Sequence, residues 1–448
     1  MPQSICANIA TKFICRCTKA ICAAFLLSLM AGGPSAAQDA AASPTETAVS
    51  LAALLREAEQ NNPQIQAAWQ AWQAARKVPS QVSTLPDPQF QVQQLNVGSP
   101  RPFAGYTNSN FAYFGLGFSQ DIPYPGKLHL KGEIAQRDAS VAQQQYESVR
   151  RSVLESFKAA YFQLVSLDNT LKILRDDSAL LQQVERAAAA RYQSGAGNQQ
   201  DVLEAQLEQT KLLRETASTE LSSAQAEARL KEILNRSQAS SDITPSGLPE
   251  SALPYTFEEL LDAAIKQNPD ISGAEKIVER QKLAVNLAKK DFYPDFNIQY
   301  MWQRTDPAEY PAYYMLTFGI RVPIYRRRRQ RPELEQSQAD LNASRSAYQA
   351  ETQQVSLELR NEYDAAQKTS QILTIYREGL VPQSRAEFQA GLAGYETGRQ
   401  DFQATLSAFL DVLRLDQEYW QTSAEHETAL AQLEKLTGLA LLEEGDGK

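Results

Sequence analysis

The sequence predicts a mainly helical protein with a few strands, built from one unit that occurs twice. The first observation is repetition: residues 60–65 (QNNPQI) return as residues 266–271 (KQNPDI), and residues 88–93 (PQFQVQ) return as residues 294–299 (PDFNIQ). The second is composition, since Ala, Gln, Glu, Leu and Arg are abundant, as in long helices and coiled coils. A repeat of about 200 residues is too long for a solenoid and indicates a duplicated supersecondary assembly.

The N-terminal residues 1–37 have the three regions of a secretory signal peptide. A basic region (residues 12–19) precedes an apolar run (residues 21–31), and small residues then offer a cleavage site before Gln38. All four cysteines lie in this segment, so we expect no thiol, disulfide or attached lipid in the mature chain. Removing the segment changes the formal charge from −9 to −12, which argues against nucleic-acid binding.

The repeats are expected to occupy residues 38–247 and residues 248–442, followed by a short acidic tail at residues 443–448. A linker rich in Ser and Pro, residues 237–254, separates them. Each repeat has the same order of predicted elements: a short helical segment, two strands, and two long helices joined by a turn that contains glycine.

In the first repeat, residues 51–77 have helical periodicity that is interrupted near Pro63, and Pro79 is expected to end the helix. The elements that follow are strands at about 89–97 and 111–122 and a helical hairpin at about 127–235.

The second repeat shows the strand pattern more clearly, at about 294–304 and 312–323, before a helical hairpin at about 332–438. Apolar and polar residues alternate, which puts one apolar face on each strand. The residues predicted to face lipid are Phe296, Ile298, Tyr300, Trp302, Leu316, Phe318 and Ile320. Strands with one apolar and one polar face and aromatic ends are typical of a barrel that spans a bilayer. The alternative is two hairpins of a soluble sandwich.

The predicted long helices need partners. Residues 127–192 contain no proline, and as a single helix they would be on the order of 100 Å long. A helix of that length is expected to pack as a coiled coil against the helix that follows Gly195. In the second hairpin, Gly379 and Pro382 are the expected kinks.

The strand count predicts an oligomer. Both repeats together supply four strands, and four strands cannot close a barrel, whose open edges would leave backbone groups unpaired in lipid. Two copies would give eight strands, three copies twelve and four copies sixteen. A lumen lined by small and polar residues favours three copies, because an eight-stranded barrel is filled by its own side chains.

Two segments then carry a family resemblance. Residues 120–128 (QDIPYPGKL) and residues 85–88 (LPDP), set in the duplicated order of elements, resemble the heavy-metal, CusC/CzcC-like branch of the TolC-type outer-membrane efflux factors. The resemblance implies a homotrimer with a 12-stranded outer-membrane barrel and a periplasmic α-helical tunnel, in a Gram-negative bacterium. It also implies a passive exit duct of a tripartite efflux system, which docks to a periplasmic adaptor (membrane fusion) protein and an RND-type or other inner-membrane pump.

The turns of the two long hairpins are the candidate entrance to such a duct. The first turn region is similar to the family's tip motif and contains Tyr192, Gly195, Asp201 and Glu204. Asp201 and Glu204 lie one helical turn apart, so three copies would present acidic rings, although an acidic first turn also simply stabilises a helix.

The second turn region contains Tyr395, Gly398, Arg399 and Asp401, and it reads as three residues shorter between its tyrosine and its acid. Arg399 is a candidate partner of Asp201 or Glu204.

The strongest charge run follows the last strand and comprises Arg326, Arg327, Arg328 and Arg329. At a membrane boundary it is expected to contact anionic lipid headgroups, and the alternative is a solvated basic junction.

No pattern indicates an enzyme or a cofactor. The mature chain has two histidines, far apart in sequence, and neither a phosphate-binding loop nor a nucleophile motif. A metal relay would need clustered soft ligands, which the sequence does not show. The rival hypotheses are a periplasmic coiled-coil adaptor or a structural filament without a membrane barrel, and the apolar strand faces argue against both.

Overall fold

The computed structural model describes residues 50–95, 112–249, 251–304 and 311–442. The predicted signal peptide at residues 1–37 and the tail at residues 443–448 lie outside these residues, as do parts of the predicted strands of the first repeat. The described residues belong to one compact unit. Among the described residues, no helix combines the length and the apolar composition needed to cross a lipid bilayer.

The first repeat has the predicted order of elements. They are α1 (Leu51–Asn61), α2 (Pro63–Ala75), α3 (Val78–Ser83), β1 (Gln89–Leu95), β2 (Tyr113–Ile122), α4 (Lys127–Gln193) and α5 (Gln199–Ile233). The sequence predicted that Pro79 ends the helical segment, and this prediction is wrong. Pro79 lies in the first turn of α3, where the missing N–H has no partner to lose.

The second repeat follows the same order. Its elements are α6 (Phe257–Gln267), α7 (Pro269–Lys290), β3 (Asp295–Arg304), β4 (Tyr313–Arg321), α8 (Gln330–Ile375), a π-helical turn (Tyr376–Leu380), α9 (Val381–Glu396) and α10 (Phe402–Thr437). The expected interruption near Gly379 and Pro382 is this π-helical turn, after which Pro382 occupies the first turn of α9.

A repeated asparagine explains why the first matched motif occurs twice. The Asn62 side chain accepts a hydrogen bond from Gln64 N–H (2.9 Å) at the start of α2, and its Nδ2 donates to Ile233 O at the end of α5 (2.9 Å). Asn268 does the same at the start of α7 and donates to Leu436 O at the end of α10 (3.1 Å). Each asparagine therefore caps a helix and ties the beginning of its repeat to the end.

The four strands form one antiparallel sheet in the order β1-β2-β3-β4. The pairing places the predicted apolar residues on one face. One row across all four strands consists of Phe90, Phe118, Tyr300 and Leu316, and the next of Val92, Leu116, Trp302 and Tyr314. The other face carries mostly polar and small side chains together with two methionines, and one of its rows is Gln91, Gly117, Met301 and Met315. Most of the apolar face is solvent-exposed in a single copy.

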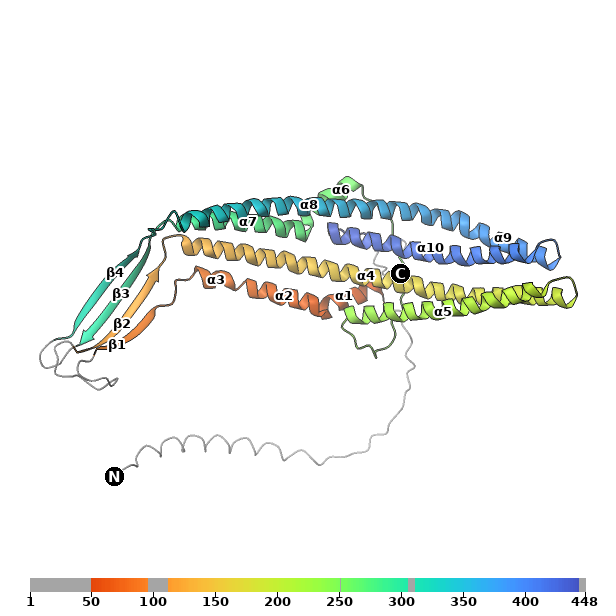
Figure 1. Cartoon of the computed structure of the whole chain (residues 1–448), viewed down its shortest axis with the longest axis horizontal. Helices are drawn as coiled ribbons and strands as arrows, with labels where there is room; N and C mark the ends of the chain where they lie inside the picture. The colour runs from red at the N-terminus through yellow and green to blue at the C-terminus, as the bar shows by residue number, and fades with distance from the viewer. Residues whose placement is uncertain (1–49, 96–111, 250, 305–310, 443–448) are drawn as a thin grey trace, which may run out of the picture. The chain divides into compact units, whose positions relative to one another are not determined.

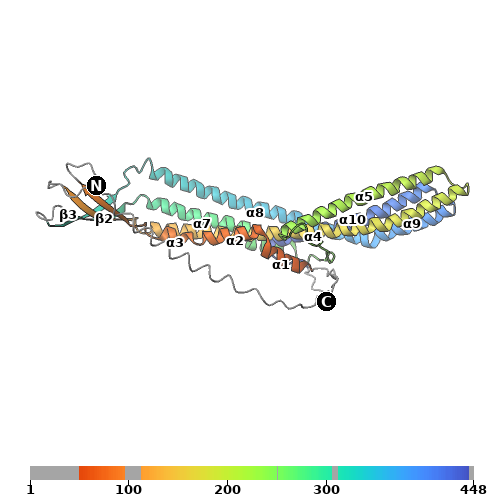
Figure 2. The same ribbon diagram turned by 90° about the horizontal axis from the view of Figure 1, so that it is seen from below.

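The long helices pack alongside one another (Figure 1). Helix α4 contacts α5, α7 and α10, and α8 contacts α7 and α10. Seen from below, the sheet lies at one end of these helices and the two hairpin turns lie at the other (Figure 2). Two clusters of buried apolar residues hold them together, one around Phe157, Tyr161 and Leu430 and one towards the turns around Phe388 and Phe409.

Candidate functional site at the hairpin turns

The two hairpin turns have the same backbone. In the first, Gly195 has a φ of 73°, and Ala196 N–H donates to Arg191 O (2.8 Å). In the second, Gly398 has a φ of 74°, and Arg399 N–H donates to Gly394 O (2.8 Å). This is a helix C-cap that needs a residue with positive φ, which glycine supplies without strain.

The turns are also equally long, so the prediction of a shorter second turn is wrong. Five residues join α4 to α5, and five join α9 to α10. The acids occupy different positions instead. Asp201 lies inside the first turn of α5, whereas Asp401 is the N-cap of α10 and accepts a hydrogen bond from Ala404 N–H (2.7 Å). The number of residues between tyrosine and acid therefore differs between the turns because Asp201 and Asp401 are not equivalent positions.

Tyr395 joins the two hairpins. Its hydroxyl donates to Asp201 Oδ2 (3.0 Å), and its side chain is only 2% exposed, with the ring 5.6 Å from that of Phe402. Burial and the bond to Asp201 raise the pKa of Tyr395 to about 12, so the hydroxyl keeps its proton at neutral pH. Tyr192, the matching residue of the first turn, is 48% exposed.

Arg191 is the second link between the turns, and the sequence reasoning missed it. Its guanidinium lies 4.7 Å from the centre of the Tyr395 ring. Nη1 donates to Tyr395 O, and Nη2 donates to Ala196 O (3.1 Å). One side chain thus holds both turns. An alignment of the two repeats could have revealed Arg191. Gly394 stands at the matching position of the second turn, so only the first turn has a cation there.

Glu204 also bonds across the hairpins. Its carboxylate accepts from Gln200 Nε2 (2.9 Å) on its own helix and from Gln403 Nε2 on α10. Arg399 has no side-chain bond to Asp201 or Glu204 in the part of the chain that the structure describes, so that pairing was wrong. Both predicted acids therefore have partners within one copy.

A pair of buried carboxylates lies further along the helices from the turns. Asp177 of α4 and Asp416 of α10 are both almost fully buried, and Asp416 accepts from Arg385 Nη2 of α9 (2.8 Å). Burial, followed by the charge of Asp416, raises the pKa of Asp177 to about 7. Three helices from both hairpins thus share one charged cluster that no sequence pattern indicated.

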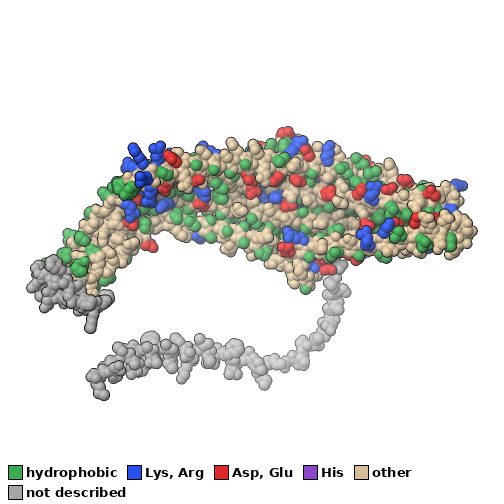
Figure 3. All heavy atoms as spheres, viewed as in Figure 1, with side chains coloured by type: hydrophobic (Ala, Val, Ile, Leu, Met, Phe, Trp, Pro, Cys, Tyr) green, Lys and Arg blue, Asp and Glu red, His purple; other side chains and the backbone are tan. Residues whose placement is uncertain are grey.

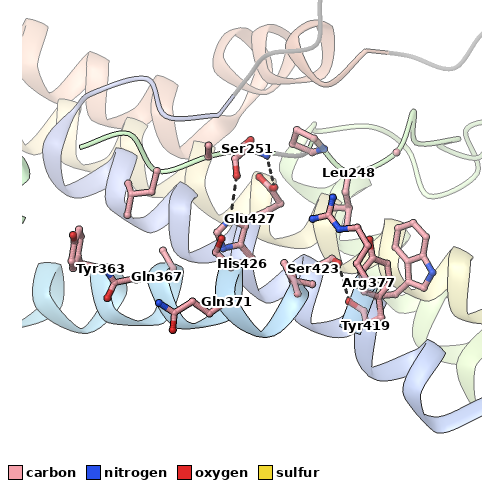
Figure 4. Close-up of a pocket in the computed structure, with 18 residues that line it drawn as sticks. Leu248, Ser251, Tyr363, Gln367, Gln371, Arg377, Tyr419, Ser423, His426 and Glu427 are labelled. Carbon is pink, nitrogen blue, oxygen red and sulfur yellow. Dashed lines mark hydrogen bonds between the residues drawn. The ribbon is translucent and has the colours of Figure 1, made fainter. Parts of the chain in front are cut away.

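The linker between the repeats covers a cavity of about 690 Å³ against α8 and α10 (Figure 4). Ser251 N–H donates to Glu427 Oε1 (3.1 Å), and Ser251 O accepts from His426 Nε2 (3.2 Å). The other ring nitrogen of His426 lies 2.9 Å from Thr369 Oγ1. Because both ring nitrogens are engaged, His426 holds the linker on α10 and does not present a free base.

The structure brings the two strand methionines together, which the sequence did not reveal. Met301 and Met315 are cross-strand partners on the polar face of the sheet. Two thioethers are too few for a dedicated soft-metal site. No group of three or more His, Cys, Asp or Glu side chains among the described residues is arranged to hold a metal ion.

The duplicated fold is that of a known protein family. The family model described as outer membrane efflux protein matches residues 54–236 and 260–439, one segment in each repeat. The chain belongs to this family. It is an outer-membrane efflux channel of Gram-negative bacteria, and the family is not enzymatic.

Particular relatives agree at this level. The multidrug resistance outer membrane protein MdtQ of Escherichia coli O157:H7 is 25% identical over 383 residues, which cover 76% of this chain and 77% of MdtQ. The structure of the outer-membrane channel OprN superposes with a TM-score of 0.76 at 18% identity, over 87% of this chain and 89% of OprN. CusC gives a TM-score of 0.75 at 17% identity, over 87% of this chain and 92% of CusC. These similarities confirm the predicted fold class and do not resolve the branch of the family.

Proposed function

We propose that three copies of this chain form the exit duct of a tripartite efflux system, closed at its far end by the hairpin turns. The observation that carries the proposal is the link between the hairpins: Tyr395 donates to Asp201, and Arg191 bonds both turns. A contact that joins two hairpins can hold them together in one state and release them in another. The duct itself is passive, and an inner-membrane pump and a periplasmic adaptor deliver the substrate.

The proposed trimer is supported by the sheet. Its apolar face is exposed in one copy, and β1 and β4 are both edge strands. Edges and apolar faces of this kind require partners in lipid. Three copies would supply twelve strands, with Phe296, Ile298, Tyr300, Trp302, Leu316, Phe318 and Ile320 towards lipid.

The gate is tested by single-channel conductance in planar bilayers. Tyr395→Phe removes only the hydroxyl that bonds Asp201. A hydrogen bond to a charged group is worth about 1.5–3 kcal/mol, so the ratio of open to closed time should rise on the order of tenfold or more. Tyr192→Phe is the matched control, because the Tyr192 side chain is exposed, and it should conduct like the wild type. Equal behaviour of all three proteins would show that the gate lies elsewhere.

The trimer has a separate test. Outer membranes from expressing cells are run on gels without and with boiling, and a band of three copies should collapse to one on boiling. A monomer in both lanes would contradict the proposal whatever the conductance of the variants.

Two observations point to different substrates for the duct. MdtQ is named for multidrug resistance, whereas residues 120–128 resemble the heavy-metal branch. We propose the heavy-metal branch on that motif and assign the choice of substrate to the pump. Deleting the gene should then sensitise cells to copper, silver or zinc salts more than to organic antibiotics, and the reverse result would move the protein to the multidrug branch.

A further inference from the structure

Four consecutive arginines shortly after the last strand have no side-chain partner among the residues that the structure describes. We call Arg326, Arg327, Arg328 and Arg329 the junction arginines. All four are exposed, and their turn is closed by backbone bonds, including Arg329 N–H to Tyr325 O (3.0 Å). None of them forms an ion pair with any described residue, whereas Arg331 next to them bonds Glu335 (2.9 Å). Basic side chains gather where the sheet meets the long helices (Figure 3).

The corresponding junction of the first repeat neutralises its charge internally. Lys127 is buried there, and its Nζ lies 3.0 Å from both Asp291 and Asp295. These carboxylates come from the segment around the start of β3, the strand beside β2. The chain is therefore able to pair a cation at this level, and it does so once.

A second copy of the chain does not repeat this neutralisation. In the proposed trimer, which this inference assumes, the strand beside β4 is β1 of the next copy. The segment from α2 to the start of β1 contains a single acid, Asp87, together with Arg76 and Lys77. One carboxylate cannot balance four guanidiniums, so most of the junction arginines stay free to bind an anion from outside the protein.

The residues before the junction arginines indicate which kind of anion would reach them. Ile324 is 74% exposed and Tyr325 is 69% exposed, and both follow the apolar face of β4 directly. An apolar surface that leads to an aromatic and then to basic side chains is the order found at a membrane interface. Guanidinium groups bind phosphate with two parallel hydrogen bonds.

We propose that the junction arginines bind the phosphate groups of anionic phospholipids, such as phosphatidylglycerol, in the leaflet that faces the periplasm. The leaflet follows from the chain direction, because the long helices, which the proposed duct places in the periplasm, begin directly after these residues. The site would anchor the depth of the channel in the bilayer at the point where strands give way to helices.

The test measures lipid selection by the purified oligomer. The wild-type protein in detergent is mixed with equal amounts of phosphatidylglycerol and phosphatidylcholine with the same acyl chains, and the lipids retained after gel filtration are quantified by mass spectrometry. We expect phosphatidylglycerol to be enriched. Replacing the junction arginines by Gln should lower the enrichment by about fivefold for each arginine that touches a headgroup. High salt should also lower it.

A matched variant replaces Arg175, Arg186, Arg214 and Arg345 by Gln, which removes the same charge from exposed helical positions. It should keep the wild-type enrichment, and helical circular dichroism checks that both variants fold. Equal enrichment in all three proteins, or none in the wild type, would overturn the proposal. Lipid A is added as a third competitor, and its preferential retention would overturn the assignment to phospholipid.

The channel and the lipid site fail differently. A wild-type protein that forms no trimer and no channel contradicts the proposed function. A conducting trimer without preference for phosphatidylglycerol contradicts only the lipid site.

Discussion

At the residue scale, the two hairpin turns have the same backbone conformation but differ in the burial of one tyrosine. Tyr192 and Tyr395 occupy the same place in the two C-caps, yet the first is exposed and the second is buried. The difference comes from Arg191, which covers the Tyr395 ring, and from Phe402 beside it. The duplicated chain thus keeps the turn that both hairpins need and specialises one tyrosine for a contact between them.

The positive φ of Gly398 gives a prediction about stability. Gly398→Ala should lower the free energy of unfolding by about 1 kcal/mol or more, because a Cβ is strained in the left-handed region. Gly379→Ala is the control, since a Cβ there meets no atom within 4 Å and the backbone is helical. Guanidinium unfolding followed by circular dichroism measures both. A Gly398→Ala protein as stable as the wild type would contradict the argument.

At the element scale, the buried carboxylates join α4 of the first hairpin to α9 and α10 of the second. Asp416 has Arg385 as a partner, whereas Asp177 Oδ2 is buried without a hydrogen bond. Asp177 is therefore the carboxyl group whose protonated form is favoured. Two neighbouring buried carboxylates that share one cation cannot both ionise without a large cost in free energy.

This cluster predicts a pH dependence with a definite sign. The pKa of Asp177 is about 7 in the folded chain and 3.8 in an ordinary environment, so the folded state binds the proton more tightly. The free energy of unfolding should therefore fall as pH rises between these two values. Asp177→Asn carries no charge, so it should remove this slope, and its free energy of unfolding above pH 7 should exceed that of the wild type by up to about 4 kcal/mol.

The measurement is guanidinium unfolding across that pH range. Asp176→Asn is the control, because Asp176 is exposed, and it should keep the wild-type slope. An unchanged slope in Asp177→Asn would show that Asp177 is ionised in the folded protein.

At the scale of the whole molecule, a single copy leaves apolar helix faces uncovered. Along α5 the exposed leucines are Leu203, Leu207, Leu213 and Leu221. Leu203, Leu207 and Leu221 lie on the side of α5 away from its buried residues Ala205, Leu212 and Leu230, and Leu213 lies on the flank between them. Stripes of this kind on a soluble surface mark interfaces. In the proposed trimer a neighbouring copy covers them.

These leucines give a test of the trimer that does not involve the sheet. Leu207→Gln with Leu221→Gln should weaken each interface, since burying a leucine contributes about 1.5–3 kcal/mol, and should shift the unboiled gel band towards the monomer. Leu207→Met with Leu221→Met keeps the apolar character and should stay trimeric. A stable trimer in the glutamine variant would place the interface on other faces.

Local patterns in the sequence were enough for the duplication, the order of elements in each repeat, the length of α4 and the apolar face of the strands. Each of these depends on periodicity or on residues close in the chain, such as the alternation from Phe296 to Trp302 or the prolines that flank the strands. Local patterns gave wrong predictions in two places. Spacing from tyrosine to acid was taken as the length of each turn, although the two acids occupy different positions. Pro79 lies in the first turn of a helix, where it was expected to end one.

Only the tertiary structure decided which distant side chains meet. Arg191 and Tyr395, Asp177 and Asp416, and Met301 and Met315 have unremarkable neighbours in sequence, and most of these pairs join segments about 200 residues apart. Their contacts depend on the rotation of one long helix against another and on strand register, which residue periodicity does not specify. By itself the sequence determined what each repeat builds, and the packing of the two repeats determined where the candidate gate and its charges lie.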